Sequence, residues 1–174
     1  MIKDLIVNLK VGADSDPAAD YAISIASTFN AHVAGIAFAY DPVIPPSIMG
    51  GIPADFIEAQ RTESAKSAKA AIARLEAAAK RNGLVAETRM LSATLAGAAD
   101  QFGRMARRFD ISVIGQPKPK EAAPEEFITE GVLFGSGRPV VVVPYIQKDA
   151  LKLNRVIACW DGSRMDSIRR RPMR

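Results

Sequence analysis

Two groups of residues in this sequence could bind an anion, because lysines stand directly after short apolar runs. Lys10 follows the run that begins near Asp4, while Lys118 and Lys120 follow the run DISVIG at 110–115. Ligands of open α/β sheets bind beyond the carboxyl ends of the strands, where these lysines are expected. The three lysines could therefore hold an anionic ligand together, or they could simply be solvated.

The residue types needed for catalysis or for metal binding are scarce. The only histidine, His32, begins a predicted strand, and the only cysteine, Cys159, lies inside an apolar run. Neither supports a nucleophile–base relay or a metal site. Asp14, Asp16 and Asp20 cluster at a predicted helix start, where carboxylates act as caps. We expect no catalytic residue and no metal ligand, and enzymatic activity stays uncertain.

The elements that position these residues alternate between strand and helix. Strands are expected at 4–11, 32–40, 84–91, 110–115 and 139–144, and helices at 17–30, 54–82, 94–109 and 125–134. The first helix carries Asp16-Pro17 at its start, a capping residue followed by proline at the first helical position. This alternation predicts an α/β fold with a doubly wound parallel sheet and helices on both faces.

Composition and charge narrow the class of protein. The chain has 174 residues and a net charge of +4, and the whole excess comes from its last twenty residues, which hold six arginines against two aspartates. No apolar run approaches the roughly 20 residues that cross a bilayer. We therefore expect a cytoplasmic protein that binds neither a membrane nor a specific nucleic acid.

Three strings carry a resemblance to a known family. They are VIGQ at 113–116, GVLFGSGRPVVVVP at 131–144 and VIACWDGS at 156–163. With the order and spacing of the strands, they resemble the universal stress protein family, and specifically the first half of a tandem member. The resemblance implies a domain over 1–146, a linker over 147–154 and an incomplete second-domain fragment with a basic tail over 155–174.

The resemblance also implies a strand order of 3-2-1-4-5 and a crevice between the first and fourth strands. The candidate binding residues are Lys10, Val11, Gly12, Gly115, Gln116, Lys118, Gly135 and Ser136. Many members bind ATP with a glycine, a second glycine three residues on and a Gly-Ser or Gly-Thr ten residues later. Glycines let backbone N–H groups approach a phosphate.

This sequence departs from that motif. Gly115 matches the first glycine, but Lys118 replaces the second, and Gly135-Ser136 comes twenty residues after Gly115. Lys10 stands at the first-strand position where ATP-binding members carry an aspartate, and Pro117 removes an N–H donor. Gly115 could instead make a strand-end turn, and Gly135-Ser136 could cap a helix.

The motif therefore predicts a degenerate nucleotide-binding loop in a non-catalytic stress-response domain that acts through dimerisation and partner or small-ligand binding. The alternative is an ATP-binding universal stress protein with slow or no hydrolysis. No cofactor is certain, although ATP or another adenine nucleotide is permitted. An enzyme related to electron-transfer flavoproteins or ATP pyrophosphatases would need a phosphate loop that we do not find.

The last predicted strand suggests self-association. Val140, Val141, Val142 and Val143 are all apolar and would form a sheet edge in the order 3-2-1-4-5. Natural proteins cover or pair such edges. We expect a homodimer through this strand. We also expect the apolar run 155–160 to be buried against another surface.

Overall fold

The computed structural model describes residues 2–42, 53–119, 124–157 and 159. Its elements, in chain order, are β1(Asp4–Asn8), α1(Pro17–Phe29), β2(His32–Tyr40), α2(Ala54–Arg81), β3(Ala86–Ala93), α3(Leu95–Ala106), β4(Ile111–Gly115), α4(Pro124–Gly135) and β5(Val140–Val143). The predicted alternation of strand and helix is confirmed.

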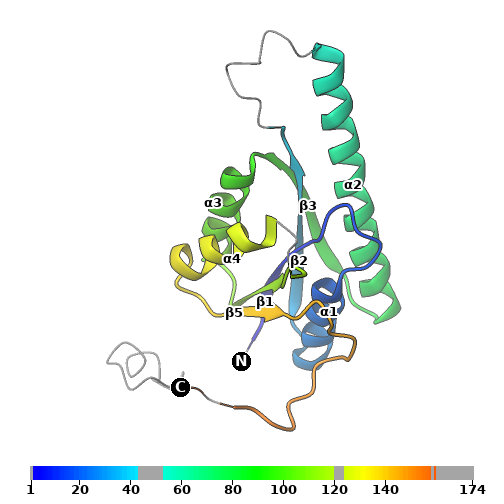
Figure 1. The fold of residues 1–174 in the computed structure, drawn as a ribbon. Coiled ribbons are helices and arrows are strands. Elements are labelled where there is room, and N and C mark those ends of the chain that lie inside the picture. Colours follow the sequence, from blue (N-terminus) through cyan, green and yellow to red (C-terminus); the bar gives the residue numbers. More distant parts are fainter. Residues whose placement is uncertain (1, 43–52, 120–123, 158, 160–174) are drawn as a thin grey trace.

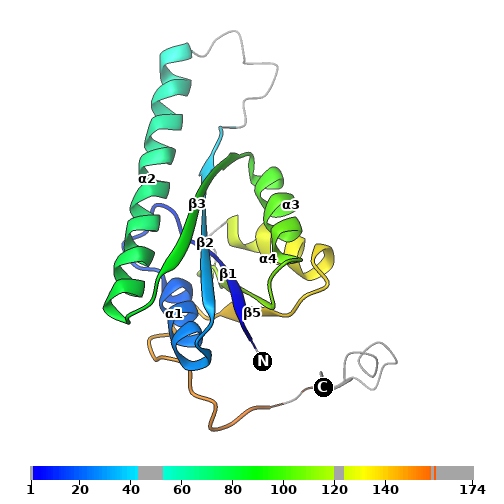
Figure 2. The same ribbon diagram turned by 180° about the vertical axis from the view of Figure 1, so that it is seen from behind.

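The five strands form one parallel sheet in the order β3-β2-β1-β4-β5. Helices α1 and α2 cover one face and α3 and α4 the other, and α2 extends well beyond the sheet (Figures 1 and 2). The predicted α/β fold class and strand order are therefore confirmed. The order reverses between β1 and β4, so their carboxyl ends leave a crevice between them.

Each face of the sheet packs against its helices through a separate apolar cluster. On the α1/α2 face, strand residues such as Val7 and Val33 pack against alanines of the helices and Leu75. On the other face, Phe38 and Phe102 are fully buried, with their ring centroids 6.5 Å apart. The small helix residues of the first face let α1 and α2 lie close to the strands.

Glycine lets α3 and α4 approach closely. A Cβ atom on Gly103 would lie 2.7 Å from the carbonyl oxygen of Gly131, and one on Gly131 would lie 2.7 Å from that of Ala99. Real Cβ atoms are essentially never that close to backbone, so any larger residue at either position would push the helices apart.

Several element boundaries differ from those expected. β1 ends at Asn8 and not at residue 11, because the chain turns at Gly12, whose φ is +74°. β3 begins and ends two residues later than expected, and α3 ends at Ala106. The apolar run at 155–160 forms no strand in its described residues 155–157 and 159, and Val156 and Ile157 are exposed.

The segment expected to be a linker folds back onto the domain. The backbone N–H of Leu151 donates to Ser24 Oγ of α1 over 2.9 Å, and the Leu151 side chain packs against the α1/α2 cluster. Residues 144–151 thus lie along α1, which brings Tyr145 near the crevice.

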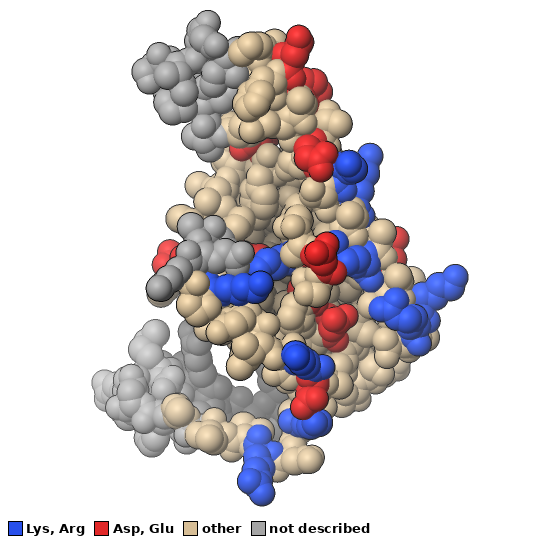
Figure 3. All heavy atoms as spheres, turned by 45° about the vertical axis from the view of Figure 1, so that its right-hand side comes forward, with Lys and Arg blue, Asp and Glu red and all other residues tan. Residues whose placement is uncertain are grey.

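The surface shows no concentration of one charge on the face seen in Figure 3, where acidic and basic side chains are interspersed. Within the described ranges, no helix has both the length and the apolar character that a membrane span requires.

Candidate functional site

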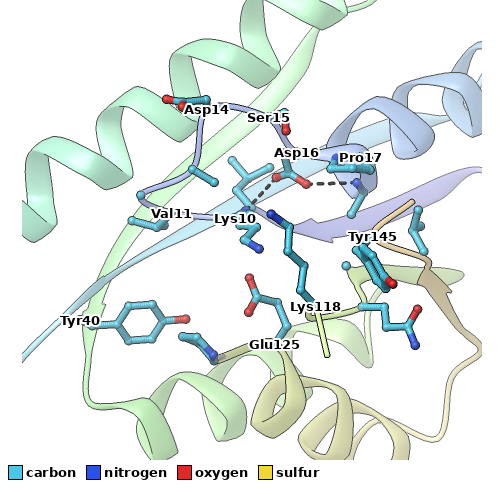
Figure 4. Close-up of a pocket in the computed structure, with 18 residues that line it drawn as sticks. Lys10, Val11, Asp14, Ser15, Asp16, Pro17, Tyr40, Lys118, Glu125 and Tyr145 are labelled. Carbon is cyan, nitrogen blue, oxygen red and sulfur yellow. Dashed lines mark hydrogen bonds between the residues drawn. The ribbon is translucent and has the colours of Figure 1, made fainter. Parts of the chain in front are cut away.

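A cavity of about 510 Å³ opens at the carboxyl ends of β1 and β4 (Figure 4). The residues that line it are Leu9, Lys10, Val11, Gly12, Ala13, Asp14, Ser15, Asp16, Pro17, Ala18, Tyr40, Gly115, Gln116, Lys118, Pro124, Glu125, Val143 and Tyr145. Six of the eight predicted binding residues belong to this set, and they come from the loop after β1, the end of β4 and the loop that follows it.

The carboxylate of Asp16 occupies the N-terminus of α1. Its Oδ1 accepts the backbone N–H groups of Ala18 and Ala19, each over 3.1 Å, and its Oδ2 accepts that of Lys10 over 2.7 Å. Amide groups at a helix N-terminus form a ready anion site. In this chain, the amides of Ala18 and Ala19 already hold a carboxylate of the protein itself.

Burial makes this arrangement costly for the charged carboxylate. Asp16 is only 8% exposed, and desolvation raises its pKa above the ordinary value, although the three backbone hydrogen bonds and the positive charge of Arg74 act in the opposite direction. Arg74 of α2 also donates from Nη2 to the Lys10 carbonyl over 2.8 Å. The loop after β1 is therefore held from both sides.

A second carboxylate lies at the first turn of α4. Glu125 is buried, and its side chain points into the cavity toward the region where Lys10 and Lys118 lie (Figure 4). Burial, and next the negative charge of Glu125, raise the pKa of Tyr40 well above its ordinary value. Tyr40 therefore stays a protonated hydroxyl that can donate a hydrogen bond at the cavity wall.

The cavity carries charges of both signs. Lys10 and Lys118 contribute positive charge, while Asp14, Asp16 and Glu125 contribute carboxylates. Lys118 extends into the middle of the cavity (Figure 4) and forms no ion pair with a described residue. This wall can bind a polar ligand through hydrogen bonds, but its carboxylates oppose a highly charged anion.

Gly135 and Ser136 do not line this cavity, so their predicted place in the binding site is corrected. Helix α4 starts at the cavity and runs away from it, which carries these residues to its far end. There Ser136 Oγ donates to the Val132 carbonyl over 2.7 Å, and Arg107 Nε donates to the Gly135 carbonyl over 2.9 Å. Both residues end the helix, the alternative that the sequence left open.

Four of the cavity residues that sequence reasoning missed as site residues carry side chains used in the argument above or lie close to them. They are Asp16, Tyr40, Glu125 and Tyr145. Asp16 was predicted only as a cap, which it is, but the bond from Lys10 N–H depends on the unforeseen turn after β1. Tyr40 ends β2, Glu125 is the second residue of α4, and Tyr145 follows β5. A search for polar residues at every carboxyl strand end would have found Tyr40.

The remaining chemical candidates lie elsewhere. His32 stands at the amino end of β2, with Nδ1 3.5 Å from Asp4 and Nε2 3.6 Å from Glu87. Cys159 is exposed. No cluster of metal-binding residues is found in the described part of the chain. Lys120 and the Asp161-Gly162-Ser163 string lie outside the described residues.

Comparison with known proteins gives structural neighbours only. No family model and no curated protein matches the chain. A universal stress protein from Lactobacillus plantarum matches with a TM-score of 0.59 and 16% identity, over 82% of this chain and 97% of that one. One solved in complex with cAMP matches with a TM-score of 0.52 and 23% identity, over 82% and 97%.

A third neighbour, from Archaeoglobus fulgidus and in complex with dAMP, matches with a TM-score of 0.51 and 15% identity, over 82% and 99%. These identities are too low to show more than the fold. The chain therefore has the fold of the universal stress proteins.

Proposed function

We propose that this chain is a non-catalytic universal-stress-protein-type domain that binds a small polar ligand in the β1/β4 crevice without a phosphate cradle, and that associates through β5. One observation carries the first half: Asp16 accepts the amides of Ala18, Ala19 and Lys10, so the anion site of α1 is filled from within. Adenine nucleotides bound to neighbours of the same fold support an adenosine-like ligand.

The second carboxylate strengthens this proposal. Glu125 lies at the first turn of α4, where the helix dipole would otherwise favour a phosphate. A triphosphate entering the cavity would meet both Asp16 and Glu125, so added phosphates should bring little affinity. The ligand would be recognised by hydrogen-bonding groups such as Tyr40 and Gln116.

A calorimetric titration with adenosine, AMP, cAMP and ATP tests the crevice. We expect the affinity to change little from adenosine to ATP. The Asp16→Ser variant keeps an acceptor for the cap but frees the Lys10 amide and removes a charge, so it should bind ATP more tightly than the natural chain does. Asp20→Asn, which removes a charge from the same helix turn without those three bonds, is the matched control.

Micromolar binding of ATP, more than tenfold tighter than that of adenosine, would overturn this proposal. It would favour the alternative function, an ATP-binding protein with Lys118 on the phosphates. Equal ATP affinity for the natural chain and Asp16→Ser would show that the carboxylate does not block the site.

The proposed association rests on the β5 edge. Among the strands of the described residues, β5 pairs with β4 alone, and its four residues are all valine, with Val142 43% exposed. Unpaired apolar edges are templates for another strand. A second copy of the chain would pair there around a twofold axis, the simplest closed arrangement.

Sedimentation velocity at micromolar concentration tests this association. We expect a dimer for the natural chain and a monomer for Val142→Lys. Val85→Lys is the control, because Val85 is an 89% exposed valine that precedes β3 at the other side of the sheet. A monomeric natural chain would refute pairing through β5.

A further inference from the structure

A second, smaller cavity lies on the face of the sheet that α3 and α4 cover, toward the amino ends of the strands. Its volume is about 170 Å³. The residues that line it come from β1, β2, β3, the end of α3 and the turn that follows α3, and they are Ile6, Ala34, Ile36, Glu87, Arg89, Met105, Arg108 and Phe109. None of them belongs to the crevice described above.

The floor of this cavity is apolar and buried. Ile6, Ala34 and Ile36 belong to the α3/α4 cluster, and Met105 and Phe109 pack beside them while remaining partly exposed. Apolar cavities of roughly 150 Å³ in proteins stay dry and accept molecules of the size of benzene. The floor is therefore suited to one small ring or branched hydrocarbon.

The rim of the cavity is charged, with a net positive balance. Arg89 donates from Nε and Nη2 to Oε1 of Glu87, over 3.0 and 2.8 Å, so these two charges offset one another. His32 lies 3.6 Å from the other Glu87 oxygen. Among the described residues, Arg108 forms no ion pair and no side-chain hydrogen bond. Its guanidinium remains available to an anion.

We propose that this cavity binds a small carboxylate that carries an aromatic ring or a compact hydrocarbon group. The hydrocarbon group would lie on Ile6, Ala34 and Ile36, and the carboxylate would contact the Arg108 guanidinium at the rim. A guanidinium matches a carboxylate with two parallel N–H donors, which lysine cannot offer. The apolar floor and the unpaired arginine thus select the same amphiphilic class of ligand.

The size of the cavity limits that class. Benzene, with six carbon atoms, is the reference for a void of this volume. A ring with one carboxylate therefore fits if the charged group remains at the rim, whereas a long fatty acid or a nucleotide does not. This site is independent of the crevice, so either proposal can fail alone.

Benzoate is the probe, with benzyl alcohol as a neutral molecule of similar shape. In methyl NMR spectra of the full chain, benzoate should shift the resonances of Ile6, Ala34, Ile36 and Met105. Benzyl alcohol should cause the same shifts only at concentrations about tenfold higher or more, since it loses the charge-assisted hydrogen bonds.

Two variants separate the parts of the site. Arg108→Gln should weaken benzoate binding about tenfold and leave benzyl alcohol unchanged. Arg104→Gln changes an exposed arginine of the last turn of α3, four residues before Arg108, that does not line the cavity, and it should change neither affinity. Absence of shifts at Ile6, Ala34 and Ile36 with millimolar benzoate would overturn the proposal. So would an Arg108→Gln variant that binds both probes as the natural chain does.

Discussion

Two aspartates at opposite ends of the sheet make the same kind of contact with different consequences. At the carboxyl end, Asp16 accepts three backbone N–H groups inside the crevice. At the amino end, Asp110 Oδ2 accepts the N–H groups of Lys3 and Asp4, over 2.8 and 3.1 Å. Asp110 thus bonds to the start of β1, and Asp16 bonds to the loop that follows β1.

Their pKa values shift in opposite directions. Burial raises the pKa of Asp16 despite three hydrogen bonds. The bonds from Lys3 and Asp4 lower the pKa of Asp110, which is not buried. The number of amide donors does not explain this difference, because Asp16 accepts more of them than Asp110 does. Burial, which disfavours the charged carboxylate, sets the direction of the pKa shift at Asp16. The carboxylate whose charged form is disfavoured by burial, that of Asp16, therefore lies at the crevice, where an anionic ligand could otherwise bind.

The largest expected effect comes from removing the crevice carboxylate. Asp16→Ala leaves the amides of Lys10, Ala18 and Ala19 without their acceptor at a mostly buried site. Loss of a helix cap and of buried hydrogen bonds should lower the free energy of unfolding by about 2–3 kcal/mol. Urea denaturation at neutral pH measures it. A loss below that of Asp110→Ala would contradict the comparison.

The exposed carboxylate should matter less. Asp110→Ala removes the acceptor for Lys3 and Asp4, but water can replace it at this surface. We expect a loss of about 0.5–1 kcal/mol, measured in the same urea experiment. Hydrogen exchange should also speed up at the Lys3 and Asp4 amides, whereas the Ala18 amide should be unaffected.

The pH dependence of stability should separate the two aspartates by sign. The folded pKa of Asp16 is raised, so its contribution is greatest below its ordinary value of 3.8 and falls as the pH rises through the folded pKa. The folded pKa of Asp110 is lowered, so its contribution is present above 3.8 and is lost as the pH falls through the folded pKa.

Asp16→Asn and Asp110→Asn, unfolded in urea at a series of pH values, reveal these signs. The stability of the natural chain relative to Asp16→Asn should decrease as the pH rises above about 4. Relative to Asp110→Asn it should increase as the pH rises from the lowered folded pKa of Asp110 toward 3.8, and it should stay constant above that pH. Parallel curves for the two variants would show that burial does not distinguish the sites.

A helix cap outside the crevice gives the smallest expected effect and isolates capping from burial. Thr94 Oγ1 accepts the Gly97 N–H of α3 over 3.3 Å at an exposed position. Thr94→Ala should cost about 0.5 kcal/mol, seen as a small shift of the urea midpoint. A loss as large as that of Asp16→Ala would mean that the cap alone accounts for the Asp16 effect.

Much of the fold follows from local patterns in the sequence. The five apolar runs, the Asp16-Pro17 helix start and the valines of β5 predicted the elements correctly. The end of β1 was wrong, because the apolar character of Leu9 and Val11 continues past the point where the Gly12 turn leaves the sheet. Leu9 N–H still bonds to the Ile36 carbonyl, so the pattern and the pairing end at different residues.

The site was less predictable than the fold, because its residues meet only through tertiary structure. Glu125 reads as an ordinary residue of a helix's first turn until α4 is placed over the crevice. Conversely, Gly135 and Ser136 seemed suitable by type, but the direction of α4 carries them away. Spacing in sequence could not reveal either result, whereas the carboxyl strand ends predicted that Gly115 and Lys118 lie at the crevice, and both line the cavity there.

The glycine contact between α3 and α4 limits how the crevice can respond to a ligand. Gly103 and Gly131 bring the backbones of α3 and α4 into close contact. We therefore expect the two helices to move together, with Glu125 in the first turn of α4 moving with them. If the crevice changes shape when a ligand binds, we expect the change in the short segments that carry Lys118 and Tyr145.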